Sequence, residues 1–567
     1  MNGESFLTLL APELIVLLGA IVVLMMGLAG SERVRAATRP VALLSVFAAF
    51  LVTWHFGLRD NSLRQAGMNF TDLTWYVRLV ALGIGLLVLL VHWHLPQSAE
   101  RGDVFAMILF SLSGILLTSL ADDLVLLFLT IELVSVPTYI LVSIGRSDIR
   151  AQEAGLKYFF LGALSAALLA YGFSFLYGAT GTTLLSGMHL ADSGGFMTIG
   201  LLLAFAGLAF KIAAVPFHVY AADVYQGAAS PVTGLLGFFP KLAGFVAIIK
   251  LVALVQPPGP VTAGWNMPAA AFVFLWVVAA ATMTIGNVLG LMQTNVKRIL
   301  GYSSIAHSGY MLVALLVGPV AGGGPLRDGL SAMLFYIVVY GVMNLGAFAV
   351  LALLKAGGRD AEELDDLAGL SRRQPLAALA LAICVFSLMG MPPTAGFFAK
   401  IYVFSTALSS GWDGGRGSAL VVLAVIGVLN SAIAAAYYLR IVAACYLREP
   451  AIEVATPTPN RFLHLGLLGC CTAILLLGLW PDGLIRMARQ PFYDLRAPAP
   501  PAIYETAAPS PQISDRSRIQ ATVADRLESP KTIEDLISES VLDSGQFFVV
   551  GDSNPSSGRA RQAAEMD

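Results

Sequence analysis

Long apolar runs follow one another along most of the chain, separated by short polar stretches. Most are about 20 residues long, which is the length that a helix needs to cross a hydrocarbon core of about 30 Å. One such run could be a signal peptide, but a series of them cannot. The pattern predicts an all-α polytopic membrane protein with about 14 spans, at residues 6–29, 38–57, 73–94, 104–120, 122–145, 153–178, 196–220, 230–255, 269–292, 298–318, 329–354, 376–408, 418–447 and 463–480.

Two of these spans are interrupted by proline. The seventh breaks near Pro216 and the twelfth at Gly390–Pro393, and each carries a lysine close to the break, Lys211 and Lys400. The two spans are five positions apart, and an odd offset places the second unit upside down relative to the first. Inverted repeats with discontinuous helices are how many transporters build a site at mid-membrane depth. The alternative is that these prolines merely kink two ordinary helices.

The repeat hypothesis divides the chain into five parts. These are helices 1–3 (residues 1–103), a first inverted repeat of helices 4–8 (104–255), a second of helices 9–13 (269–447), helix 14 (463–480) and a polar tail (495–567). The tail opens at Ala497–Pro501, and its acidic, Ser/Gly/Ala-rich composition predicts a largely disordered segment. Apolar residues at helical spacing between Ile533 and Val541 predict one short amphipathic helix within it.

The positive charges between the spans are unevenly distributed. With 14 spans, the loops on one side hold about 14 Lys and Arg residues and those on the other side only 4. Cytoplasmic loops carry the excess of positive charge. The sequence therefore predicts that both termini lie on the outer side of the membrane.

Composition supports a membrane protein and excludes several other classes. Of the 567 residues, 57% are apolar and 12% charged, about half the charged content of a soluble domain. The net charge of −2 gives no reason to expect a nucleic-acid partner. Cys384, Cys445, Cys470 and Cys471 form no Cys-x-x-Cys pair and have no histidine at ligand spacing, so they predict free apolar thiols rather than a zinc or iron–sulfur site.

Four ionisable residues fall deep inside predicted spans. Glu132 lies in the middle of span 5, Lys211 in span 7, Lys241 in span 8 and Lys400 in span 12. A charge at the bilayer centre costs roughly 2.5–3.5 kcal/mol, so such residues are usually functional. A lysine responds to burial and to a nearby carboxylate in opposite directions, so a partner that approaches and withdraws switches it between holding and releasing a proton. Glu132 beside Lys211 would form such a switch; purely structural ion pairing is the alternative.

Other ionisable residues leave the choice open. Lys157 is near enough to the end of span 6 for its ammonium to reach the interface. His218 and His307 can either pass protons or serve as hydrogen-bonded structural residues. Arg440, deep in span 13, suits anchoring because its charge is permanent, and Glu13 has no evident partner in the sequence.

The chain has no evident redox or nucleotide motif. Gly83 and Gly85 lack the third glycine of a dinucleotide fingerprint and lie within an apolar span, and neither a Walker lysine nor a haem-ligand pattern is present. Driving energy must then come from an ion gradient or from a partner protein.

Several short segments, in this order, resemble one family. They are Glu153–Leu164, Phe210–His218, Ser230–Thr233 leading to Lys241, Asn295–Arg298, Tyr302–His307, Met343–Phe348, Met391–Lys400 and Tyr437–Arg440. Together they resemble subunit N of NADH-quinone oxidoreductase (respiratory complex I), an antiporter-like membrane subunit, over about residues 100–480. The run Ala-Gly-Leu-Lys-Tyr-Phe within the first segment distinguishes subunit N from its sister subunits and from multisubunit cation/proton antiporters.

The resemblance implies further expectations. It implies fourteen helices with inverted repeats in helices 4–8 and 9–13, and a proton relay of Glu132, Lys211, Lys241 and the exit group Lys400, to which it adds Lys157 and His218. It implies that quinone reduction in neighbouring complex I subunits drives the protons, and that NAD, FMN, iron–sulfur clusters and quinone bind in those partners rather than in this chain. It also implies the inner membrane of a bacterial cell. The tail beyond about Leu495 is not usual for the family.

Three functions compete at this point. A proton-translocating subunit of a redox-driven assembly is the leading hypothesis. A secondary cation/proton antiporter is permitted by the same repeat design, and a structural subunit with merely paired buried charges is the third.

Overall fold

The computed structural model describes residues 6–56, 63–65, 67–93, 101–146, 148–188, 195–254, 264–320, 324–356, 359–413, 416–449, 454–455 and 460–489. The chain divides into two units, Met1–Ala499 and Pro500–Asp567, and all described residues belong to the first. The amphipathic helix predicted in the tail lies outside the described residues.

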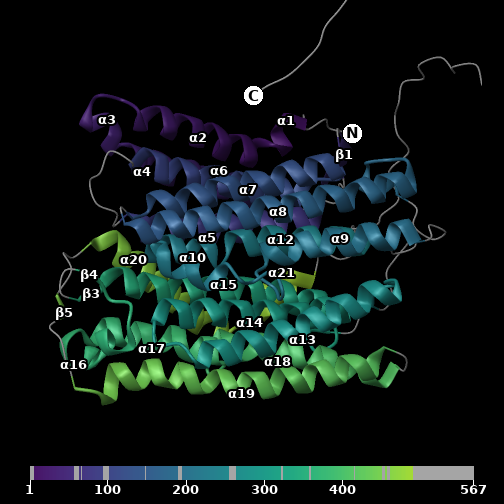
Figure 1. Cartoon of the computed structure of the whole chain (residues 1–567). Helices are drawn as coiled ribbons and strands as arrows, with labels where there is room; N and C mark the ends of the chain where they lie inside the picture. Colours follow the sequence, from purple (N-terminus) through teal and green to yellow (C-terminus); the bar gives the residue numbers. More distant parts are fainter. Residues whose placement is uncertain are drawn as a thin grey trace, which may run out of the picture. The chain divides into compact units, whose positions relative to one another are not determined.

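The first unit is a bundle of long helices that lie side by side (Figure 1). The helices that make or contribute to spans are α2 (Ala11–Gly27), α4 (Thr38–Phe56), α5 (Asp72–His92), α6 (Arg101–Leu120), α7 (Leu124–Ile144), α8 (Ile149–Thr180), α9 (Gly195–Lys211), α10 (Ala221–Gly227), α11 (Ser230–Leu236), α12 (Phe239–Ala253), α13 (Ala269–Leu291), α14 (Val296–Val317), α15 (Gly329–Leu353), α17 (Pro375–Met389), α18 (Ala395–Ser409), α19 (Gly417–Leu447) and α20 (Arg461–Leu479). Short helices α1 (Phe6–Leu9), α3 (Glu32–Ala36), α16 (Leu370–Arg373) and α21 (Asp482–Arg489) flank them, with single 3-10 turns η1 (Leu185–Gly187), η2 (Leu364–Leu367) and η3 (Ser410–Asp413).

The fold class predicted from the sequence is confirmed. Eleven helices in the described part of the chain are long and apolar enough to cross a membrane. Three more spans come from shorter apolar helices: α2, α9, and α17 with α18 as two halves of one. Each of these spans overlaps a predicted one. The division into inverted repeats at particular residues stays a prediction.

Burial differs sharply between helices and identifies the centre of the bundle. The most apolar stretch of α15 is wholly enclosed, whereas only 33% of the corresponding stretch of α8 and of α19 is buried. In Figure 1 α19 lies at the lower edge of the bundle and α15 lies inside it. The exposed apolar side chains of the outer helices suit contact with lipid.

Both predicted helix breaks are present. α9 ends at Lys211 and α10 begins only at Ala221; α17 ends at Met389 and α18 begins at Ala395. Both breaks contain a cis proline, Pro216 and Pro393. Span 7 was predicted to end at residue 220, but after the break it continues as α10, from Ala221 to Gly227. A third break separates α11 from α12 in span 8, which the sequence analysis did not predict.

In the described residues strands occur only in loops, as one antiparallel pair and one small three-stranded sheet. β1 (Leu63–Gln65) pairs antiparallel with β2 (Met68–Phe70), and β3 (Lys355–Ala356) pairs antiparallel with β4 (Arg359–Asp360) and β5 (Val454–Ala455). They close loops and form no sheet in the core.

One end of the bundle carries a connected cluster of charges, here called the basic end. It contains Arg146 after α7, Lys297 at the start of α14, and Glu362 in the loop after α15. Glu362 accepts from Arg146 at 2.6 Å and from the fully buried Lys297 at 3.3 Å. Burial alone would raise the pKa of neighbouring Asp360, but its bond to Lys355 and the charge of Arg146 hold that pKa below its ordinary value. The bond between Arg146 and Glu362 joins segments 216 residues apart in the chain.

A second buried ion pair explains Glu13. Arg78 of α5 donates two hydrogen bonds to the Glu13 carboxylate, at 2.7 and 2.8 Å, and a third to the Leu9 carbonyl. Both side chains are buried, so the pair joins the first helices to α5. The partner that the sequence did not reveal is therefore 65 residues away.

Candidate functional site

Glu132 and Lys211 form an ion pair between α7 and α9. The Lys211 ammonium donates to the Glu132 carboxylate at 2.8 Å and to the Ser135 hydroxyl at 2.7 Å, with Tyr139 at 3.5 Å. Ser135 and Tyr139 lie on α7 one and two turns beyond Glu132, the spacing that puts side chains on neighbouring parts of one face. The pair that the sequence predicted as a switch is therefore in direct contact.

The two members of this pair have different surroundings. Lys211 is 4% exposed, whereas Glu132 is 21% exposed. Glu132 lies on α7 within a stripe of exposed residues, between Leu129 and Val136. A carboxylate at this depth is costly to leave against hydrocarbon, so this flank of α7 requires a polar cover.

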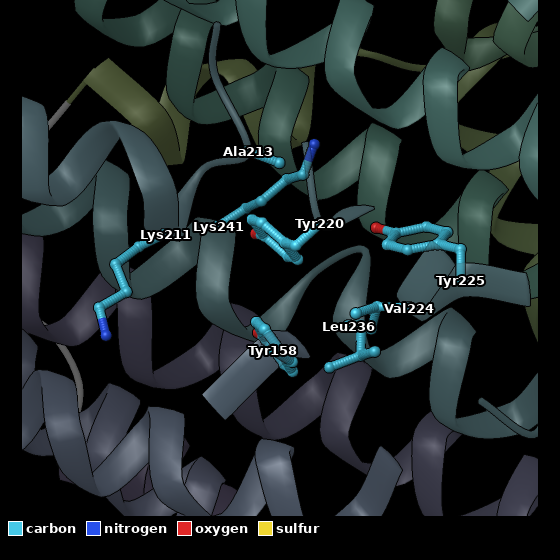
Figure 2. A pocket seen from close by; sticks show the side chains of 8 residues that line it. All are labelled: Tyr158, Lys211, Ala213, Tyr220, Val224, Tyr225, Leu236 and Lys241. Carbon is cyan, nitrogen blue, oxygen red and sulfur yellow. The ribbon is translucent and has the colours of Figure 1, made fainter. Parts of the chain in front are cut away.

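A small cavity connects Lys211 with Lys241. It is lined by Tyr158, Lys211, Ala213, Tyr220, Val224, Tyr225, Leu236 and Lys241. The cavity has room for about one water molecule, because the volume open to the centre of a water is about 10 Å³. Figure 2 shows the Lys241 side chain beside the Tyr220 ring and the Lys211 side chain to the left of it, with the two ammonium groups directed away from each other. Both lysine side chains line this cavity, while the Lys211 ammonium bonds Glu132 and the Lys241 ammonium bonds Ser308.

Lys241 follows Pro240 in the first turn of α12 and reaches α14. Its ammonium donates to the Ser304 carbonyl and, at 2.7 Å, to the Ser308 hydroxyl. Ser308 in turn donates to the Ile212 carbonyl at 2.5 Å, immediately after Lys211. The break in helix 7 thus exposes a backbone carbonyl that Ser308 uses to connect the surroundings of the two lysines.

A histidine–tyrosine cluster occupies the space between Lys241 and Lys400. The fully enclosed His307 ring is hydrogen-bonded through Nδ1 to Tyr336 at 2.7 Å and through Nε2 to Tyr438 at 3.0 Å. The Lys241 ammonium lies 5.2 Å from the centre of the Tyr340 ring, and that ring packs on His307. Hydroxyl and imidazole groups in contact can pass protons along hydrogen bonds.

Sequence reasoning left His307 undecided and missed these tyrosines. The tyrosines come from α15 and α19, which α16, α17 and α18 separate in the chain. The four-residue spacing of Tyr336 and Tyr340 on an otherwise apolar helix was the one available signal.

Lys400 sits one turn into α18, directly after the second helix break. Its ammonium donates to the Met389 carbonyl at 2.8 Å, which the break leaves without a helical partner. It also lies 5.4 Å from the centre of the Tyr310 ring, which packs edge-on against His307. Gly390 has φ +90° and its backbone lies against the Lys400 side chain, so a Cβ there would stand 2.8 Å from Lys400 Cδ.

Lys157 and His218 lie apart from this line. Lys157 is 43% exposed and pairs with Glu153 at 2.8 Å and with Asp223 at 2.9 Å. The next residue, Tyr158, lines the cavity, so Lys157 is adjacent to it in sequence without entering it. His218 is half-buried in the segment between α9 and α10, and its Nδ1 has no hydrogen-bond partner.

The four cysteines are buried free thiols, as expected. Arg440 donates to the Leu291 and Gln293 carbonyls at 2.6 and 2.8 Å, which anchors α19 to the end of α13. This is the anchoring role expected from its permanent charge.

Fold and site together define an antiporter-like, multi-pass membrane subunit with two broken helices and buried lysines. The family described as NADH:quinone oxidoreductase/Mrp antiporter, TM matches residues 121–430. NADH-quinone oxidoreductase subunit N of Trichlorobacter lovleyi is 37% identical over 78% of this chain and 88% of the relative. The same subunit of Rhodospirillum rubrum is 35% identical over 84% of this chain and 96% of the relative. This chain belongs to the family of NADH-quinone oxidoreductase subunit N.

Solved structures have the same fold. A chain of respiratory complex I from Thermus thermophilus with bound aureothin is 28% identical, with a TM-score of 0.69 over 84% of this chain and all of that chain. A chain of the Mrp complex from Dietzia sp. is 20% identical, with a TM-score of 0.70 over 86% of this chain and 98% of that chain. The second likeness shows the fold alone.

Proposed function

We propose that this chain translocates protons across the membrane through Glu132, Lys211, Lys241, His307 and Lys400, as a membrane subunit of NADH-quinone oxidoreductase. The observation that carries the proposal is the position of Lys211. Its ammonium bonds the Glu132 carboxylate, and its side chain lines the same cavity as Lys241. A lysine that contacts a carboxylate on one side and a cavity able to hold water on the other keeps its proton while the carboxylate is near. When the carboxylate withdraws, the lysine can release the proton to water in the cavity.

The lysines of the relay have different partners, and this difference sets where a proton rests. Lys211 is held by a carboxylate, whereas Lys241 and Lys400 donate to neutral carbonyl and hydroxyl oxygens. When Glu132 is drawn away, Lys211 gives its proton to water in the cavity and Lys241 receives it. His307 and its tyrosines then connect Lys241 to Lys400, and Lys400 releases the proton.

The driving force comes from outside this chain. Glu132 is partly exposed on the flank of α7, where a neighbouring membrane subunit with a polar surface covers it and moves its carboxylate. In the proposal NAD, FMN, iron–sulfur clusters and quinone bind in the other subunits of the complex, where quinone reduction supplies the energy; membership of the subunit N family supports this. The complex lies in the bacterial inner membrane, with the basic end of this chain facing the cytoplasm and both termini outside, as the distribution of Lys and Arg predicts.

Lys157 and His218 are proposed to act before the central line. Lys157 is exposed enough to take protons from water at the basic end. His218, with its free Nδ1, stands in the unwound segment that follows Lys211.

Replacement of Lys211 or Lys400 tests the proposal. K211A and K400A are expected to lower proton pumping coupled to NADH oxidation in membranes by about tenfold or more, since a positioned proton carrier contributes at least that much. K355A is the matched control, because Lys355 is a partly exposed lysine of a surface loop. Pumping at the wild-type rate by an intact complex would sink the proposal. Full turnover after K211M and K400M would favour a structural role.

A cation/proton antiporter is the second candidate, and the fold shared with the Mrp complex chain favours it. Exchange of Na⁺ or K⁺ for protons by the purified chain in vesicles would support it. No exchange, together with NADH-dependent pumping by the assembled complex, would exclude it.

A further inference from the structure

The short helix α10 forms one wall of the cavity between Lys211 and Lys241. Val224 and Tyr225 line the cavity from α10, and Val224 is fully buried. On its other side α10 carries Asp223, whose side chain is 39% exposed at the basic end. One helix thus separates the cavity from the polar region outside it.

α10 has little intrinsic stability. It is seven residues long, follows the unwound segment 212–220 and has no side-chain N-cap. Isolated helices shorter than about 12 residues do not persist in water, so the contacts of α10 with its neighbours fix its position. It packs mainly on α14 and α8.

Asp223 supplies a charge bridge between those two neighbours. Its Oδ2 accepts from Lys157 of α8 at 2.9 Å, and its Oδ1 accepts from Arg298 of α14 at 2.7 Å. A carboxylate that uses both oxygens on cations from two helices fixes the helix that bears it more firmly than a single pair.

The last turn of α10 is held by two neighbouring residues of α14, Lys297 and Arg298. The Gln226 carbonyl accepts from the buried Lys297 at 2.9 Å, and Arg298 also donates to the Gln226 side chain at 3.1 Å. Two other carboxylates lie near these groups: Glu362, which Lys297 reaches at 3.3 Å, and Glu153, which pairs with Lys157 within α8 and is 63% exposed. α11, the third neighbour of α10, contributes no charged side chain.

We infer that Asp223 is a positioning residue: it bridges Lys157 and Arg298 and so holds α10 closed over the cavity between Lys211 and Lys241. When the bridge is released, α10 moves away from α8 or α14 and the cavity opens toward the basic end. The consequence for proton entry rests on the proposed function; the closure itself does not.

Thiol labelling tests the closure directly. A cysteine at Val224 reports access to the cavity, because the four native cysteines are buried in α17, α19 and α20. Membranes with the assembled complex are treated with a membrane-impermeant maleimide, in right-side-out and then inside-out vesicles. V224C is expected to label slowly from both sides. D223N/V224C is expected to label about fivefold faster from the side of the basic end, since two partly exposed pairs are together worth on the order of 1 kcal/mol.

Two controls separate positioning from a general loss of charge. E153Q/V224C removes a carboxylate that pairs with Lys157 inside α8 and makes no bridge to α10. Its labelling rate is expected to match that of V224C. D223E/V224C keeps the charge and is expected to restore slow labelling. An unchanged rate in D223N/V224C, or equal acceleration by E153Q, would overturn the inference. Where D223N prevents assembly, R298Q/V224C removes the other half of the bridge and carries the same expectation.

The outcomes are distinguishable from those of the proposed function. Normal pumping by K211A would defeat the relay and leave accelerated labelling by D223N intact. Conversely, if K211A abolishes pumping while D223N/V224C labels no faster than V224C, the relay stands and the closure by Asp223 is rejected.

Discussion

The three buried lysines show how one residue type acquires different properties from its neighbours. Lys211 has a carboxylate partner, Lys241 has a carbonyl and a hydroxyl, and Lys400 has a carbonyl and an aromatic face. An ammonium among neutral groups costs more free energy to keep than one paired with a carboxylate. Positive charge is therefore most stable at Lys211 while Glu132 is close, and this sets where a proton rests.

Ser308 is the residue whose removal tests the link between Lys211 and Lys241. S308A leaves the Ile212 carbonyl without its donor and Lys241 with one acceptor fewer, which costs about 1–3 kcal/mol locally. We expect NADH-driven proton pumping to fall several-fold while the complex still assembles. The measurement is the pumping rate per assembled complex in inside-out vesicles.

S165A provides the control for this prediction. Ser165 also donates from a buried hydroxyl to a backbone carbonyl, that of Gly207, and it does so without touching a lysine. It should lose similar stability and keep its pumping rate. Equal pumping by S308A and S165A would show that Ser308 is only structural.

Among the elements, the interrupted helices are what the sequence predicted best. A proline and a lysine in each of spans 7 and 12 indicated the breaks, and both are present. The break between α11 and α12 was missed because Pro240 lies in the first turn of α12, where proline is tolerated. The tyrosines around His307 were missed because hydropathy gives spans but not which helices become neighbours.

The second break depends on Gly390 in two ways. Its φ of +90° is one that residues with a Cβ rarely adopt, and its bare Cα accommodates the Lys400 side chain. G390A is expected to cost roughly 1–2 kcal/mol in backbone strain and, in addition, to displace Lys400 and lower pumping. Pumping and thermal stability of the purified complex are measured together.

Gly181 isolates the contribution of the backbone. It also has a positive φ, of +72°, at the end of α8, but a Cβ there would meet no atom within 4 Å. G181A should therefore lose stability alone. If G390A pumps as well as G181A, the contact between Gly390 and Lys400 has no part in transport.

In the molecule as a whole, helices from distant parts of the sequence are tied together by buried charges as well as by apolar packing. Glu362 joins the end of α7 to the start of α14, and Arg78 joins α5 to Glu13 in α2. Apolar side chains gain little from association in lipid, so polar contacts and close packing determine which helices become neighbours. The sequence revealed these charges individually, but their pairing depends on the assembled bundle.

Glu362 therefore controls the stability of the basic end. E362Q removes the charge that pairs with the fully buried Lys297 and with Arg146, and an uncompensated buried cation costs about 3 kcal/mol or more. We expect a clear fall in the thermal unfolding midpoint of the detergent-solubilised complex. D365N, in the same loop, removes an exposed carboxylate that pairs with Arg448, and it should change stability by less than about 1 kcal/mol. Equal unfolding midpoints for the two variants would mean that the buried cluster does not hold the end of α7 and the start of α14 together.

A fall confined to E362Q, with α10 also more accessible to label, would instead connect the same cluster to the closure of the cavity, because Lys297 bonds both Glu362 and the last turn of α10.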